Sequence, residues 1–330
     1  KRSQRKVLYS MRKKKDEMKV SQLAGYISSD TCYHHGEQSM MSTIINMAQD
    51  YIGSNNNNLL LPNGGFGTRL QGGKDAASPR YIFSKLSPYA EKVFNKKDDE
   101  ILNYLEDDGT KIEPEFFVPT LPLVLINGTE GIGTGFSSYV PCYKEEDIKD
   151  YIKNKLSSIE TKLLKPWYKN FKGTIESNED NTMFTIKGVY KQINTTTIEI
   201  TELPVGLWTQ DYKEFLESIT DTKIHSYKNQ STESTIKFIV RYFPDKIKDI
   251  WKDLKLVKTI RTTNMHLFNR DGEMKKYSSP EEIIDEFIEI RLEYYEKRKE
   301  YMLSKMKRNK AILKNKVKFV QQIVNDEIVV

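Results

Sequence analysis

The sequence contains little cysteine and no long apolar run. Only two of its 330 residues are cysteines, Cys32 and Cys142, which are too few for a disulfide framework and lack metal-ligand spacing. No apolar stretch approaches the ~20 residues of a membrane-spanning helix, and no secretory leader is recognisable. These absences argue against a disulfide-rich extracellular module and against a membrane partner. A reducing compartment is therefore expected.

Positive charge is concentrated at one end of the chain. Residues 1–20 hold nine Lys or Arg against Asp16 and Glu17, whereas the net charge of the whole chain is only +6. The rest is nearly neutral, and its 38% hydrophobic and 11% aromatic residues are typical of a folded protein. One basic end on a neutral body indicates a localised contact with a polyanion. The alternative is a basic face that is merely solvated.

Two helical patterns flank the short segment "TCYHHG" (31–36). Apolar residues recur at helical spacing on both sides of it, at Val20, Leu23, Ala24, Ile27, Met41, Ile44, Ile45 and Ala48. Two short amphipathic helices around a tight turn predict a helix-turn-helix, with the basic segment leading into it. His34 and His35 are expected at the N-terminus of the second helix, where backbone N–H groups favour a phosphate.

Two glycine-rich segments come next. In the first (59–78), a nucleotide P-loop is excluded because the spacing from Gly67 to Lys74 is one residue too long and Asp75 stands where Ser or Thr is needed. The second (116–141) predicts an apolar strand that runs into a glycine-rich loop around the lone apolar residue Ile132.

The second half of the chain predicts an α+β fold that ends in one long helix. Between about 170 and 265, short β-type runs are interleaved with the helical stretch 209–219. Ser279 and Glu282 form a capping box with Pro280 at the first helical position. Apolar residues then recur at helical spacing to the chain end, which favours a coiled coil with a partner helix. A surface helix packed on its own domain is the alternative.

Tyr81, in "GGKDAASPRYIFSKL" (72–86), is a candidate nucleophile for phosphodiester chemistry. A phenol that attacks phosphorus can later leave again, so breakage is reversible. Since its ordinary pKa is near ~10, it needs a positive site. Arg80 could stabilise charge at phosphorus, and the remaining candidates for proton transfer or positive field are His34, His35, Lys74, Arg69 and Arg5. Alone, an Arg-Tyr pair is unspecific, because the chain has 19 tyrosines.

The segments in their order carry a much more specific signal. The motifs "QRKVLY", "QLAGYI", "YHHGEQS", "LLLPNGGFGTR", "GGKDAASPRYI", "EPEFFVPTLPLVLINGTEGIGTGFS", "TIEITELP" and "RLEYYEKRKEYM" resemble the breakage–reunion core of eukaryotic-type DNA topoisomerase II, a type IIA topoisomerase, over essentially all 330 residues. The resemblance implies a winged-helix DNA-cleavage domain (1–118), an α/β tower domain (119–278) and the truncated start of a coiled-coil arm (279–330).

The resemblance also implies roles for single residues. Tyr81 is expected to become linked to the 5′ end of cut DNA, with Arg80 stabilising the transition state and with His35 and Arg5 completing the catalytic set. Ile132 matches an apolar wedge that inserts between base pairs and bends the duplex. The expected DNA-binding residues are Lys1, Tyr33, His34, Ser39, Arg69 and Lys74.

The implied activity is ATP-dependent passage of one DNA duplex through a transient double-strand break in another. Mg²⁺ and ATP are expected to be bound by domains upstream, with no metal ligands in this chain. The implied partners are double-stranded DNA and a second copy, joined through the winged-helix region and the coiled-coil exit gate. A nuclear location is expected, or a cytoplasmic replication site if the source is viral.

The sequence departs from the family pattern at two places, and two other classes of function remain possible. Arg2-Ser3 stands where Pro-Gly is usual, and Gly206-Leu207 stands where Arg and Thr are common. A tyrosine recombinase or type IB enzyme would link its tyrosine to a 3′ phosphate. An architectural winged-helix protein would bend DNA without cleaving it and would be indifferent to Tyr81→Phe.

Overall fold

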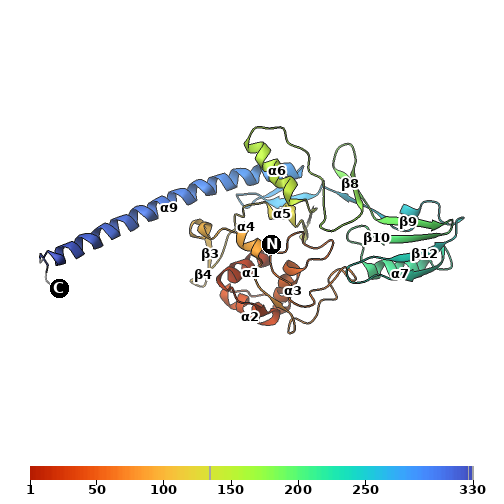
Figure 1. Cartoon of the computed structure of the whole chain (residues 1–330), viewed down its shortest axis with the longest axis horizontal. Helices are drawn as coiled ribbons and strands as arrows, with labels where there is room; N and C mark the ends of the chain where they lie inside the picture. The colour runs from red at the N-terminus through yellow and green to blue at the C-terminus, as the bar shows by residue number, and fades with distance from the viewer. Residues whose placement is uncertain (134, 326, 329–330) are drawn as a thin grey trace.

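Helix α9 (Pro280–Val324) extends far beyond the other elements, which gather around its amino-terminal end (Figure 1). The structure is a computed structural model that describes residues 1–133, 135–325 and 327–328. Every paired strand in these ranges runs antiparallel to its neighbour, and helices are interspersed among the small sheets. The α+β prediction is thereby confirmed. No helix of the described residues has the length and apolar character to cross a bilayer.

The first hydrophobic core joins the amino-terminal helices to a small two-stranded sheet. Its elements are α1 (Arg2–Lys13), β1 (Met18–Lys19), α2 (Val20–Asp30), α3 (Glu37–Ala48), β2 (Phe83–Ser84) and α4 (Pro88–Val93). Next come the 3-10 helix η1 (Lys96–Ile101) and the hairpin of β3 (Tyr104–Asp107) and β4 (Thr110–Pro114). The predicted helix-turn-helix is confirmed as α2 and α3. The inner face of α3 is centred on Met40 and Ile44, which are fully buried, rather than on Met41.

A second core lies between residues 121–164 and the start of α9. It contains α5 (Leu123–Ile126), α6 (Glu145–Leu156), and two hairpins, β5 (Thr129–Gly133) with β6 (Phe136–Val140) and β14 (Met265–Phe268) with β15 (Met274–Tyr277). The predicted apolar strand at 116–127 is wrong, because Pro119 and Pro122 interrupt that segment and α5 is a short helix. The predicted glycine-rich loop is instead a β-hairpin.

The remaining elements form two sheets at the end of the molecule opposite to α9 (Figure 1). One sheet has the order β11 (Ile224–Asn229), β12 (Phe238–Tyr242), β10 (Thr197–Glu202), β9 (Val189–Asn194), and α7 (Thr209–Ile219) packs on it. The other has the order β13 (Val257–Arg261), β8 (Met183–Lys187), β7 (Thr174–Ser177), and helix α8 (Ile250–Asp253) precedes β13. Gly188 lets the chain pass from β8 to β9, because a Cβ there would lie 2.3 Å from the Glu202 carbonyl oxygen.

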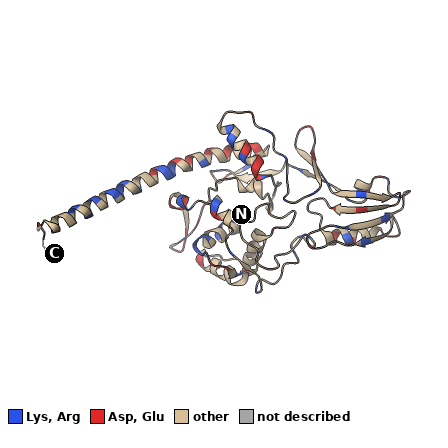
Figure 2. Ribbon diagram, viewed as in Figure 1, with Lys and Arg blue, Asp and Glu red and all other residues tan. Residues whose placement is uncertain are grey.

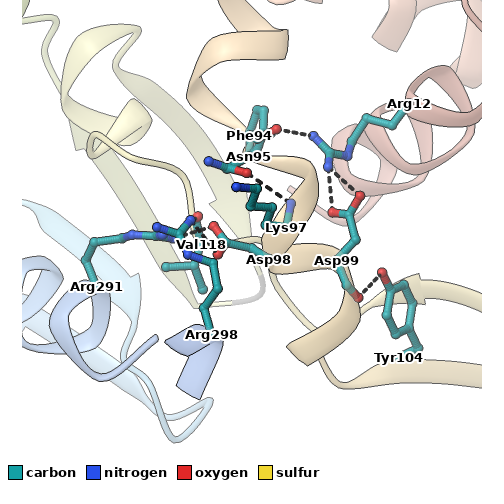
Figure 3. Close-up of polar contacts among 10 residues, drawn as sticks. All are labelled: Arg12, Phe94, Asn95, Lys97, Asp98, Asp99, Tyr104, Val118, Arg291 and Arg298. Atoms are coloured by element: carbon teal, nitrogen blue, oxygen red, sulfur yellow. Dashed lines mark hydrogen bonds and ion pairs between the residues drawn. The ribbon is translucent and has the colours of Figure 1, made fainter. Parts of the chain in front are cut away.

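Ion pairs with η1 fix the amino-terminal half of α9 (Figure 3). Asp98 of η1 lies 2.8 Å from Arg291 and 3.1 Å from Arg298, and Arg291 also donates to the Val118 carbonyl. The next residue, Asp99, pairs with Arg12 of α1 at 2.5 Å. The acidic pair of η1 therefore ties α9 to the first core.

Beyond Lys305, which lies 3.7 Å from Glu100 of η1, the distal part of α9 forms no ion pair with another element among the described residues. Its apolar side chains Leu303, Met306, Leu313, Val317, Val320 and Val324 are exposed. Figure 2 shows acidic residues near the start of the helix and basic residues along its distal half, where 301–324 hold seven Lys or Arg and no acidic residue. The predicted cap is confirmed, since the Glu282 N–H donates to the Ser279 hydroxyl and Pro280 is the first helical residue.

Candidate nucleic-acid interface

Tyr81 projects into solvent from a turn that is held tightly to the start of α2. Its side chain is 76% exposed, whereas the next residue, Ile82, is buried in the first core. The Ser21 N–H donates to the Pro79 carbonyl at 3.1 Å, and the Val20 N–H donates to the Ile82 carbonyl at 2.9 Å. These bonds flank Tyr81 on both sides, so its backbone is fixed while its phenol is open to a ligand.

Arg80 is exposed beside Tyr81, and the preceding glycine-rich loop presents Lys74. The loop is closed by Asp75, whose carboxylate accepts bonds from the Thr68 N–H at 2.9 Å and hydroxyl at 2.5 Å. Gly67 has a φ of +92°, and a Cβ there would lie 2.6 Å from the backbone of Gly73. Asp75 thus has a structural role, and this loop supports Lys74 rather than a nucleotide phosphate.

The His turn, residues 31–36 between α2 and α3, gathers several predicted DNA-binding side chains. His34 and His35 are exposed and precede the N-cap of α3, Gly36, so they lie just outside the helix and not in its first turn. The Tyr33 ring contacts His35 edge-on at 5.2 Å, and the Tyr33 hydroxyl donates to Ser39 at 3.2 Å. These contacts place three predicted DNA contacts and the predicted catalytic histidine on one surface.

Two residues of the β3–β4 hairpin hold the His turn in place. The Lys6 ammonium of α1 donates to the Thr31 carbonyl at 2.6 Å and pairs with Glu113 at 2.9 Å, and both charged side chains are buried. His34 lies 3.5 Å from Asp107. The Lys6–Glu113 pair was missed from the sequence, because a lysine within a basic run looks solvated and nothing in the sequence links it to a residue 107 positions away.

Arg5 and Lys1 lie along the same helix. Arg5 is half-buried and donates to the Pro114 carbonyl at 3.4 Å; desolvation lowers the pKa of its guanidinium, and the negative charge of Glu113 opposes that shift. The Lys1 ammonium donates to the Glu130 carbonyl at 2.6 Å. Lys1 therefore contacts the β5–β6 hairpin, whereas Arg5 lies near the β3–β4 hairpin.

The predicted DNA contact at Arg69 is wrong. Its side chain is buried, and its guanidinium lies 2.6 Å from the carboxylate of Glu202 in β10. A buried cation needs a partner of opposite charge, and Glu202 satisfies that need. Arg69 consequently links the glycine-rich loop to the sheet of β10 and is not available to a phosphate.

Ile132 lies near the tip of the β5–β6 hairpin and is 91% exposed. The hairpin is braced by the neighbouring strand β14: the Tyr139 N–H donates to the Asn264 carbonyl at 2.9 Å, and the His266 N–H donates to the Ser138 hydroxyl at 3.1 Å. An exposed isoleucine on a braced two-stranded ribbon agrees with the prediction of an apolar group presented to a ligand.

The predicted catalytic residues Tyr81 and His35 lie at opposite ends of α2. Tyr81 and Arg80 lie at its amino end, and the His turn follows its carboxyl end. The helix has 11 residues, so at 1.5 Å per residue the two groups are separated by ~16 Å. One chain therefore does not bring His35 to Tyr81.

The described residues do not fit a magnesium site. Among them, no group of three or more His, Cys, Asp or Glu side chains is arranged to hold a metal ion.

Comparison with known proteins places the chain in a family. The model of the family that comprises the A subunits of DNA gyrase and topoisomerase IV matches residues 1–329, and the chain belongs to this family.

Individual relatives agree. DNA topoisomerase 2 of Pisum sativum is 48% identical over 326 residues, which is 95% of this chain and 22% of the relative. DNA topoisomerase 2-alpha of Rattus norvegicus is 44% identical over 341 residues, 99% of this chain and 22% of the relative. The crystal structure of the Plasmodium falciparum topoisomerase II DNA-binding, cleavage and re-ligation domain superposes with a TM-score of 0.94 at 46% identity, covering 99% of this chain and 46% of that one.

Proposed function

We propose that this chain is the DNA breakage–reunion core of an ATP-dependent type IIA topoisomerase. It cleaves both strands of a duplex transiently through a 5′-phosphotyrosyl link at Tyr81, lets a second duplex pass and rejoins the ends, thereby relaxing supercoils and decatenating DNA. One observation carries the proposal: in a chain of this family, the Tyr81 phenol is 76% exposed on a backbone fixed by α2, with an exposed Arg80 beside it.

The chemical step exchanges one phosphodiester bond for another. The phenol oxygen of Tyr81 loses its proton and bonds to phosphorus, the bond from phosphorus to the 3′ oxygen breaks, and that oxygen leaves as a hydroxyl after taking up a proton. Because the number of phosphate ester bonds is unchanged, the released 3′ hydroxyl can attack the phosphotyrosine and reverse the reaction. Arg80 stabilises the extra negative charge at phosphorus in the transition state.

A second copy completes the site. Since His35 lies ~16 Å along α2 from Tyr81 of the same chain, His35 and Arg5 act on the phosphate attacked by the tyrosine of the other protomer. Cutting both strands needs two tyrosines, which a homodimer supplies. The dimer forms through the winged-helix region and through a coiled-coil exit gate that includes the exposed apolar stripe of α9.

The remaining basic and polar residues bind and bend the duplex. Lys1, Tyr33, His34, Ser39 and Lys74 contact the DNA backbone. Ile132 inserts between base pairs, at an unstacking cost of about a few kcal/mol that is offset by the contacts of the bent duplex. We assign residues 1–118 to the winged-helix cleavage domain, 119–278 to the tower and 279–330 to the coiled-coil arm.

The chain spans 22% of the length of the Pisum sativum and Rattus norvegicus relatives, and we assign the other requirements of the reaction to the rest of the protein. Mg²⁺ and ATP are bound by segments upstream. We assign the protein to the nucleus, or to a cytoplasmic replication site if its source is viral.

The polarity of the covalent link tests this function. The full-length protein is incubated with Mg²⁺ and duplex DNA labelled at either the 3′ or the 5′ end, then quenched with detergent. Once heat has separated the DNA strands, a 5′-phosphotyrosyl link retains the 3′ label on the protein and releases the 5′ label. Tyr81→Phe abolishes retention, while Tyr295→Phe, which removes a hydroxyl of the α9 surface, does not.

Two other results would contradict the proposal. Retention of the 5′ label would indicate a 3′ link, as in a recombinase or type IB enzyme. DNA binding and bending without any adduct would leave only the architectural function.

A further inference from the structure

The β5–β6 hairpin exposes a second large apolar side chain, Phe136. It is 53% exposed, and among the described residues of this hairpin only Ile132 and Phe136 are large, apolar and exposed. Phe136 pairs with Gly133, and Ile132 pairs with Ser137. Neighbouring pairs of an antiparallel ribbon place their side chains on opposite faces, so Ile132 and Phe136 project from the two faces of the same tip.

Phe136 is exposed but held by its neighbours. Its ring meets that of His266 edge-on at 6.1 Å, and the His266 N–H donates to Ser138, two residues along on the same face. The side-chain amide of Asn264 donates to the Ser137 hydroxyl at 2.8 Å, which ties the other face of the strand to the same support. The phenyl ring is therefore preorganised, and it loses little freedom when it binds a partner.

We propose that Phe136 is a second DNA-contacting residue of the wedge, which packs against the sugars or an unstacked base of the minor groove while Ile132 enters the base stack. The inference rests on the proposed function, because it needs the hairpin tip to enter DNA. Any insertion that brings Ile132 between base pairs carries Phe136 into the groove, since the two residues belong to neighbouring pairs at the tip of one narrow ribbon. An aromatic face there binds sugars and bases of any sequence.

The chain offers a matched control in Phe268. This phenylalanine is 73% exposed on β14, the strand that supports the hairpin, but it lies at the far end of that strand from Asn264 and pairs with Met274 of β15. If exposure alone mattered, alanine substitution of Phe136 and of Phe268 would have the same effect on DNA binding. If the contact is specific to the wedge, only the substitution of Phe136 changes DNA bending and affinity.

The test measures DNA bending and affinity without cleavage. The full-length dimer carrying Tyr81→Phe is mixed with a duplex that has a fluorophore at each end, and energy transfer reports the end-to-end distance. We expect Ile132→Ala to abolish most of the bend, Phe136→Ala to reduce it and to weaken binding by about tenfold, the effect of one aromatic–base contact, and Phe268→Ala to change neither. Phe136→Trp keeps the bend.

Salt dependence separates this contact from a charge effect. Because Phe136 releases no counterion, Phe136→Ala shifts affinity equally at every salt concentration, whereas Lys1→Ala lowers the salt slope by about one unit. If Phe136→Ala distorts the hairpin, Phe136→Leu, which retains an apolar side chain of similar size, still gives a partial bend.

The outcomes distinguish the two levels of the proposal. If Ile132→Ala reduces the bend and Phe136→Ala behaves like the parent, the proposed Phe136 contact is refuted, whereas the proposed insertion of Ile132 is supported. If Ile132→Ala has no effect either, the wedge itself fails. If Phe136→Ala, Phe136→Leu and Phe268→Ala weaken binding equally, the effect is not specific to the wedge and the inference is overturned.

Discussion

The two ends of helix α2 hold their functional residues by different means. At the amino end, Tyr81 is placed by backbone hydrogen bonds from Val20 and Ser21, and its side chain touches little. At the carboxyl end, the His turn is placed by side chains, chiefly the buried Lys6–Glu113 pair. Backbone bonds tolerate many substitutions, whereas a buried ion pair fails when either partner is lost. The position of Tyr81 therefore depends on few side chains, whereas the position of the His turn depends on residues distant in sequence.

The largest expected effect concerns whether the Tyr81 and His35 of one site come from different protomers, and complementation between two mutant protomers tests it. We expect Tyr81→Phe and His35→Ala homodimers each to lose double-strand cleavage, with losses of about 10²–10⁴ for the histidine if it transfers a proton. A mixed dimer carries Tyr81→Phe in one protomer and His35→Ala in the other. If the tyrosine and histidine of each site come from different protomers, this dimer has one site with both changes and one intact site. It then nicks one strand at the parental rate. The nicked product is measured on denaturing gels.

If both residues acted within one chain, the mixed dimer would have two damaged sites. Its nicking would then be no faster than that of the His35→Ala homodimer. Such a result would contradict the division of the site between the ends of α2.

The Lys6–Glu113 pair provides the next largest effect, now on stability. Lys6→Met leaves the buried Glu113 charge without its partner and is expected to lower the free energy of unfolding by about 3–5 kcal/mol. Adding Glu113→Leu to the same chain restores most of the loss. Lys13→Met, which removes the solvent-exposed pair with Asp30, costs at most ~1 kcal/mol. Urea unfolding of the parent and the three variants measures these losses, and equal losses for Lys6→Met and Lys13→Met would refute the expectation.

Near Tyr81, the two cations of the glycine-rich loop are expected to differ. Lys74 is exposed, so Lys74→Ala lowers the slope of log affinity against log salt by about one unit. Arg69 is buried against Glu202, so Arg69→Met destabilises the fold but leaves that slope unchanged in the folded protein. Titrations at four salt concentrations distinguish the two, and an equal change of slope would restore Arg69 to the DNA-binding set.

The two cysteines give the smallest expected effect. Burial raises the pKa of Cys142 to about 12, so at pH 8 it is a neutral thiol and reacts negligibly with iodoacetamide. Cys32, half-buried in the His turn, is the site that becomes labelled, and DNA bound to the turn slows its labelling. Peptide mapping of Cys32→Ser and of the parent checks this, and rapid labelling of Cys142 in the folded chain would contradict the burial described here.

The local part of the fold could be predicted from the sequence. The periodicity of α2 and α3, the β runs of residues 170–265 and the cap at Ser279 are short-range patterns, and all are confirmed. The segment 116–127 was wrongly predicted, because its apolar residues have no clear period and Pro119 and Pro122 decide its shape.

The site could be predicted only in part, because its assembly depends on long-range contacts. Tyr81 and Ile132 are exposed as expected, since glycines around a large side chain signal presentation to a ligand. Arg69 was assigned to DNA and the role of Lys6 was missed for the same reason: the burial of each depends on a carboxylate more than 100 positions away. The ~16 Å between Tyr81 and His35 arises because the turn that carries Tyr81 docks on the amino end of α2, at the opposite end from the His turn. No motif in the sequence encodes this docking.

Locating the covalent link on the chain tests the central claim most directly. The full-length protein is trapped on DNA with Mg²⁺ and detergent, the DNA is digested, and mass spectrometry finds the residue that carries the nucleotide. We predict a single adduct on Tyr81, joined to a 5′ phosphate and absent from Tyr81→Phe. An adduct on any other residue, or the same yield from Tyr81→Phe, would contradict the account.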